Sequence, residues 1–95
     1  MIEDVLKAGN YHLIDVREPM EFEMNGAIDE ATNIPLGEIE ERQDEIKGLE
    51  GNVIFFCRSG NRSGQATEFF KAQGLDNVYN GGGYEDMQQS LDNVK

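Results

Sequence analysis

The only cysteine of the chain, Cys57, heads a short cationic loop, Cys57-Arg-Ser-Gly-Asn-Arg62. The loop follows the most apolar run of the sequence and precedes a stretch typical of a helix. Backbone N–H groups of such a loop can converge on an anion, and a helix N-terminus adds partial positive charge. With two arginines nearby, this arrangement stabilises a thiolate, the nucleophilic form of a thiol. The pattern therefore predicts a reactive Cys57 in a binding loop made of Arg58, Ser59, Gly60, Asn61, Arg62 and Ser63.

A cysteine–histidine hydrolase would need a general base within hydrogen-bond reach of Cys57. The single histidine, His12, begins one β-type run, whereas Cys57 follows the end of another. If the two strands are parallel, they separate these side chains by about 15 Å, at ~3.3 Å per residue. We therefore expect His12 to have a structural role.

The length of the loop distinguishes it from other anion-binding loops. Cysteine phosphatases use Cys-x5-Arg, whereas the spacing here is Cys57-x4-Arg62, one residue shorter. The smaller ring suits one extra sulfur atom on the cysteine better than a tetrahedral oxyanion. A phosphatase or an arsenate reductase is a weaker alternative, because the chain also lacks a second cysteine. No Gly-x4-Gly-Lys-Ser/Thr pattern of a nucleotide-binding loop occurs.

The composition narrows the class of protein and its partners. The 95 residues are of a length that predicts one domain, residues 1–95, and a net charge of −11 disfavours nucleic acid as a partner. No Cys/His cluster has the spacing of a zinc site, so no metal is expected. No run approaches the ~20 apolar residues that cross a membrane, and the first residues lack the basic segment and apolar run typical of a signal peptide. We expect no membrane partner and a cytoplasmic location, or a periplasmic one if the chain is a processed form.

The chain alternates short apolar runs with longer amphipathic stretches, which is typical of a parallel sheet flanked by helices. Strands are expected over residues 12–16, 31–34, 53–56 and 77–79, and helices over residues 2–8, 19–24, 38–47, 63–73 and 84–91. The glycines 81–83 are expected to form a turn before the last helix. In sheets of this class, ligands bind at the carboxyl ends of the strands. Two strand ends carry chemistry here, because one leads into Arg17 and the other into Cys57.

Four ordered motifs resemble the rhodanese family over almost the full length. Leu13-Ile-Asp-Val-Arg-Glu-Pro19 is similar to the family's first signature and Asn33-Ile-Pro-Leu36 to its second. The Cys57 loop is similar to the family's six-residue active loop, and Asn80-Gly-Gly-Gly83 to its closing glycine segment. Ser63-Gly-Gln-Ala66 looks most like the small phage-shock-type rhodaneses.

The resemblance implies an α/β fold with a small, four-stranded, mainly parallel sheet in the order 4-3-1-2. It also implies a thiosulfate sulfurtransferase that moves sulfane sulfur from thiosulfate, or a similar donor, to a thiol or cyanide. Sulfur would be carried as a persulfide on Cys57, with no metal or organic cofactor and no required oligomer. Arg58 and Arg62 would attract the anionic donor, and Asp15 and Arg17 would position the loops by ion pairing.

The sequence departs from the family in the segment Gly26-Ala-Ile-Asp-Glu-Ala31, where the family has Gly-His-Ile-x-Gly-Ala. Glu30 replaces a glycine, so an ordinary backbone conformation or strain is expected there. The alternative that stays open is a non-catalytic module of the same fold, acting as a sulfur carrier or a regulatory binding domain.

Overall fold

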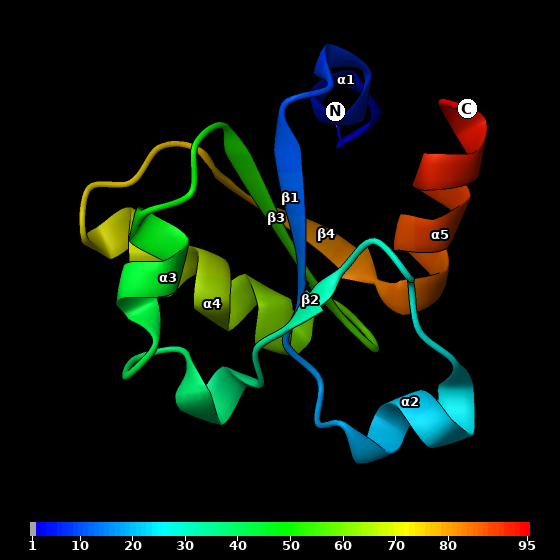
Figure 1. Ribbon diagram of the computed structural model, residues 1–95, viewed down its shortest axis with the longest axis horizontal. Coiled ribbons are helices and arrows are strands. Elements are labelled where there is room, and N and C mark those ends of the chain that lie inside the picture. Colours follow the sequence, from blue (N-terminus) through cyan, green and yellow to red (C-terminus); the bar gives the residue numbers. More distant parts are fainter. Residues whose placement is uncertain (1) are drawn as a thin grey trace.

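In the computed structural model, which describes residues 2–95, four strands form one all-parallel sheet (Figure 1). The strands are β1 (Tyr11–Asp15), β2 (Thr32–Asn33), β3 (Asn52–Cys57) and β4 (Val78–Gly83). Their spatial order is β2-β1-β3-β4, which is the predicted order 4-3-1-2 read from the other edge. Because the order reverses between β1 and β3, the carboxyl ends of these two strands open a crevice of the kind that binds ligands in α/β sheets.

Helices cover both faces of the sheet. Figure 1 shows α3 and α4 on one side, α1 and α5 on the other, and α2 beyond the carboxyl end of β1. Their bounds are α1 (Ile2–Ala8), α2 (Met20–Asn25), α3 (Gln43–Lys47), α4 (Asn61–Ala72) and α5 (Tyr84–Asn93), with a 3-10 turn, η1 (Leu36–Glu38). Within residues 2–95 no helix has both the length and the apolar character to span a bilayer.

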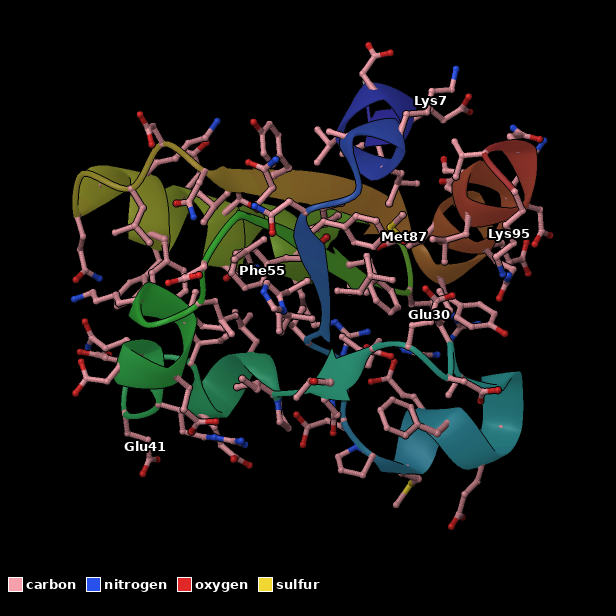
Figure 2. All side chains as sticks on the ribbon, turned by 45° about the horizontal axis from the view of Figure 1, so that its top comes forward. Lys7, Glu30, Glu41, Phe55, Met87 and Lys95 are labelled. Atoms are coloured by element: carbon pink, nitrogen blue, oxygen red, sulfur yellow. The ribbon has the colours of Figure 1, made fainter. Side chains whose placement is uncertain are left out.

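The core consists of two apolar layers, one on each face of the sheet. Towards α3 and α4, Phe55 stacks on Phe70 with ring centroids 5.6 Å apart. Towards α1 and α5, Phe56 belongs to a cluster that includes Met87 and Leu91. Figure 2 labels Phe55 and Met87 on their opposite sides of β1. Residues 53–57 are all buried, because β3 is a central strand covered on both faces.

The prediction of a single helix over residues 38–47 is wrong. The segment is divided into η1 and α3, with a turn between them. Ile39 and Ile46 are buried as expected, but the positions between them are exposed or only partly buried. Most helical stability comes from packing of an apolar face, and two buried residues one heptad apart are too few to stabilise a continuous helix. The N–H of Leu36 is also bonded to the carbonyl of Val16 at 3.0 Å, which fixes where the segment begins.

Glycines 81–83 were expected to form a turn. They form the last part of β4 instead. Phe55 pairs with Asn80 and Cys57 with Gly83, so three residues of β4 advance while β3 advances two. This bulge is possible because Gly82 has a φ of +87°, a conformation that side chains disfavour. Elsewhere in residues 2–95 every positive φ also belongs to a glycine. Of the two outcomes expected for Glu30, an ordinary backbone conformation is therefore the one present.

Candidate active site

Cys57 is the last residue of β3, and its sulfur lies within a cup formed by two backbone N–H groups and one hydroxyl. The N–H of Gly60 donates to Sγ at 3.0 Å, the N–H of Ser63 donates at 3.5 Å, and the Ser63 hydroxyl lies 3.5 Å away. The helix α4 begins at Asn61, two residues earlier than expected, so only residues 58–60 connect it to the strand. Gly60, at φ +96°, turns the chain back over the sulfur. As a result Cys57 is fully buried, at 0% exposure.

The cup changes the acidity of the sulfur. Burial acts to raise the pKa of the Cys57 thiol, because it removes water from around the charged form. Hydrogen bonds from Ser63, Ser59 and Gly60 act in the opposite direction and outweigh burial. The pKa of Cys57 therefore lies below that of an ordinary thiol, and more of the nucleophilic thiolate is present at a given pH.

The side chain of Asn80 connects β4 to this loop, a role that the sequence reasoning missed. Its Oδ1 accepts the hydroxyl of Ser63 at 2.6 Å and the N–H of Gly82 at 3.0 Å. Its Nδ2 donates to the carbonyl of Gly60 at 3.1 Å. The position of Asn80 directly before three glycines was the available signal, because an amide in such a segment often bonds to neighbouring backbone.

Close approach of β4 to the loop depends on the absence of side chains. A Cβ at Gly83 would lie 2.6 Å from the carbonyl oxygen of Arg58, and one at Gly60 would lie 3.3 Å from the Cα of Gly82. The close backbone approach expected of the glycine segment is therefore present, although it occurs within a strand and not within a turn.

The two arginines of the loop have different surroundings. Arg62 forms a two-pronged ion pair with Glu21 of α2, with both N–O distances 2.7 Å. This pair lowers the pKa of Glu21 to about 2, chiefly through the hydrogen bonds from Arg62. Arg58 is exposed, and no ion pair involving it occurs in residues 2–95. Arg62 thus fastens α2 to the start of α4, which leaves Arg58 as the cation available to an incoming anion.

Asp15 and Arg17 form a buried ion pair at the carboxyl end of β1. The Nε of Arg17 and one of its terminal nitrogens, Nη2, both donate to the Asp15 carboxylate, and the bond from Nη2 is 2.7 Å long. Nη2 also donates to the carbonyl of Gly26 at 3.0 Å. The guanidinium carbon lies over the rings of Phe22 and Tyr84, 4.9 and 4.8 Å from their centroids. The expected ion pair is therefore present. Together with the bond to Gly26, it connects the segment before α2 to the segment after it.

A cavity of about 280 Å³ adjoins the Cys57 loop on the side of α5. Its lining includes Arg58, Arg17 and Tyr84, together with the acidic residues Glu85 and Asp86. The other terminal nitrogen of Arg17, Nη1, is buried and has no hydrogen-bond partner within the part of the chain described. An oxyanion in this cavity would have two cationic neighbours, Arg58 and Arg17, and two acidic ones, Glu85 and Asp86.

His12 lies at the other end of the sheet. It pairs with Val53, four residues before Cys57 on β3, and its Nε2 lies 3.0 Å from the carbonyl oxygen of Glu50. At ~3.3 Å per residue the two side chains are about 13 Å apart along the strand direction. The expectation that His12 cannot reach Cys57 is confirmed. Within residues 2–95 no group of three or more His, Cys, Asp or Glu side chains is arranged to hold a metal ion.

Comparison with known proteins adds an independent line of evidence. Residues 2–90 match the model of the rhodanese-like domain. The chain is 39% identical over 82 residues to the protein YqhL of Bacillus subtilis, covering 84% of this chain and 64% of YqhL. It is 36% identical over 77 residues to thiosulfate sulfurtransferase PspE of Escherichia coli, covering 80% of this chain and 73% of PspE.

Among solved structures, a rhodanese with anions from Escherichia coli superposes with a TM-score of 0.70. The two are 36% identical, and the match covers 80% of this chain and 89% of that one. The structural similarity thus extends over most of both chains.

Proposed function

The chain belongs to the rhodanese-like domain family, and we propose that it transfers sulfane sulfur from thiosulfate, or a similar anionic donor, through a persulfide on Cys57. The observation that carries the proposal is the convergence of two backbone N–H groups and a hydroxyl on Sγ. The N–H groups stabilise negative charge on sulfur, and the hydroxyl does so once its proton turns towards a thiolate. The reaction requires such charge both before and after transfer. Sulfurtransferase activity of similar proteins, such as PspE, supports the same assignment.

In the proposed first step, the Cys57 thiolate attacks the outer sulfur of thiosulfate. A new S–S bond forms on Sγ, the S–S bond of the donor breaks, and its electron pair leaves with sulfite. The three negative charges of the reactants are conserved, one on the persulfide and two on sulfite. The loop N–H groups that hold the thiolate are then close enough to hold the terminal sulfur of the persulfide.

The donor has to reach a sulfur that is fully covered. Arg58 is the exposed cation beside the loop and lines the adjoining cavity, so it would attract the oxyanion end of the donor. The loop would then move away from Sγ, with Gly60 as the residue whose backbone tolerates the change. Asp15 and Arg17 would keep the neighbouring strand end in place while this happens.

In the second step a thiolate or cyanide attacks the terminal sulfur, and the Cys57 thiolate leaves. The sulfur departs as a new persulfide or as thiocyanate. In each step one bond to sulfur forms and one breaks, and no electrons have to be supplied or removed from outside. The reaction therefore needs no metal and no organic cofactor. The acceptor is a small nucleophile in this proposal.

Intact-mass measurement tests the proposal directly. The protein is mixed with thiosulfate, and its mass is compared with that of Cys57→Ser treated in the same way. We expect a gain of one sulfur atom, reversed by cyanide and absent from the variant.

A protein that gains no sulfur from thiosulfate but stays folded would contradict the proposed transfer and favour a regulatory module. A sulfur that is gained but not released to cyanide or thiols would indicate a carrier. Phosphate-ester and arsenate assays then address the phosphatase and arsenate reductase alternatives.

A further inference from the structure

The hydroxyl of Ser63 carries one proton and has two acceptors beside it. Asn80 Oδ1 lies 2.6 Å from the hydroxyl oxygen, and Cys57 Sγ lies 3.5 Å from it. A hydroxyl donates to one acceptor at a time. At these distances its proton is directed to Asn80, so the sulfur faces the lone pairs of the hydroxyl.

The orientation of the Asn80 amide is determined by the backbone. Oδ1 accepts the N–H of Gly82 at 3.0 Å, and Nδ2 donates to the carbonyl of Gly60 at 3.1 Å. A flipped amide would place its NH2 group against the N–H of Gly82 and its oxygen against the carbonyl of Gly60. Both contacts would then be repulsive, so it is the oxygen of Asn80 that faces Ser63.

We propose that Asn80 is a positioning residue that competes with Cys57 for the Ser63 proton. While Cys57 is a thiol, its S–H donates to Ser63 and Ser63 donates to Asn80. When the thiol loses its proton to solvent, the Ser63 O–H rotates towards the thiolate, and Asn80 Oδ1 keeps only the N–H of Gly82. No covalent bond other than S–H is broken. The inference rests on the proposed function for its purpose, since it adjusts the nucleophile of that reaction.

Other charges near the sulfur come from every element packed around it. They are Arg62 of α4 with its partner Glu21 of α2, the Asp15–Arg17 pair after β1, Arg58 of the loop, and Asp86 of α5, whose carboxylate lies beside Gly82 and Gly83. All of them would be present in variants in which Asn80 or Ser63 is replaced by an uncharged residue. A difference between such variants therefore reports the hydrogen bonds and not the charges.

The test is the pH profile of Cys57 alkylation by iodoacetamide, which needs no sulfur donor. Asn80→Leu removes the competing acceptor at similar size, so Ser63 can donate fully to the thiolate. We expect the midpoint of the profile to fall by about half a pH unit, the size of one modest hydrogen bond. Asn80→Ala provides a second variant of the same kind if Asn80→Leu does not fold.

A double-mutant cycle separates this role from bracing of the loop. In a Ser63→Ala background, Asn80→Leu should leave the midpoint unchanged, because there is no hydroxyl proton to compete for. An equal shift in both backgrounds, or no fall in the presence of Ser63, would overturn the inference. Failure of thiosulfate to form an adduct would contradict the proposed function while leaving the result of this cycle intact.

Discussion

The two ends of the sheet carry the single cysteine and the single histidine of the chain, but their surroundings differ. At the carboxyl ends, polar groups from four elements meet around Cys57 and the Asp15–Arg17 pair. At the amino ends, His12 lines a larger cavity of about 520 Å³, with Tyr11 and Leu49 among its other lining residues. This cavity is larger than the one beside Arg58, and it lies at the far end of the sheet from the reactive sulfur.

The difference between the two ends follows from the direction of the strands. In a parallel sheet the strands deliver their following loops, and the N-termini of their helices, to one end only. Converging N–H groups can therefore lower a pKa at the Cys57 end, whereas at the other end His12 contacts a single carbonyl oxygen. Four changes test this contrast, from the largest expected effect to the smallest.

Asp15→Asn is expected to have the largest effect on stability. It leaves the buried Arg17 guanidinium without a carboxylate, and breaking a buried pair in this way costs about 3–5 kcal/mol. Urea unfolding should show a correspondingly lower free energy of unfolding. The matched control is Glu38→Gln, which breaks an exposed pair with Arg42 and should leave the midpoint unchanged. Equal effects of the two variants would mean that the Asp15 end is not specially organised.

Gly83→Ala is expected to displace the Cys57 loop. The added Cβ would lie 2.6 Å from the carbonyl oxygen of Arg58, and relieving such a contact costs about 1–3 kcal/mol. Since the loop supplies the groups that lower the pKa of Cys57, the midpoint of alkylation should also rise. Gly37→Ala is the control, because a Cβ there meets nothing within 4 Å. An unchanged alkylation profile in Gly83→Ala would contradict the role of close approach.

Glu21→Gln removes the link between α2 and α4. The pKa of Glu21 lies near 2 in the folded protein and at its ordinary value of 4.5 in the unfolded chain. The stabilisation from its ionised form is complete above the ordinary value and is lost as the pH falls towards 2. Because the pair is partly exposed, we expect a loss of about 1 kcal/mol at neutral pH.

The pH dependence gives this variant its own check. The difference in unfolding free energy between the protein and Glu21→Gln should shrink as the pH is lowered from 4.5 to 2. A difference that stays constant across this range would show that the ion pair does not stabilise the fold.

His12→Gln is expected to have the smallest effect on sulfur chemistry. The side chain lies four residues from Cys57 along the paired strands and contacts the carbonyl of Glu50. The rate at which thiosulfate adds sulfur should change less than twofold, and glutamine preserves a donor for that carbonyl. A loss of tenfold or more would mean that the two ends of the sheet communicate.

Much of this arrangement could be predicted from the sequence because it depends on local patterns. The apolar run before Cys57 predicted a central strand, and the small and cationic residues after it predicted a loop at a helix start. The Asp15–Arg17 pair was also expected, but from the resemblance to the rhodanese family and not from a local pattern.

What could not be predicted depends on contacts between distant segments. The bonds of Asn80 with Ser63 and Gly60 join residues 17 and 20 positions apart, and the pair of Glu21 with Arg62 spans 41 positions. Periodicity carries no information on such partners. The division of residues 36–47 into η1 and α3 has a similar cause, since the bond from Leu36 to Val16 fixes its beginning.

The bulge in β4 constrains how this gene could change in length. Deleting one of the glycines 81–83 would remove the extra residue and shift α5 by one position against β3, turning Met87 away from its layer. Inserting one residue would shift α5 by one position in the opposite direction, and Met87 would again leave its layer. Near Gly9 and Gly74, where an added Cβ would meet nothing within 4 Å, insertions should be tolerated. Natural variation in length should therefore occur near Gly9 and Gly74 and be absent between Asn80 and Tyr84.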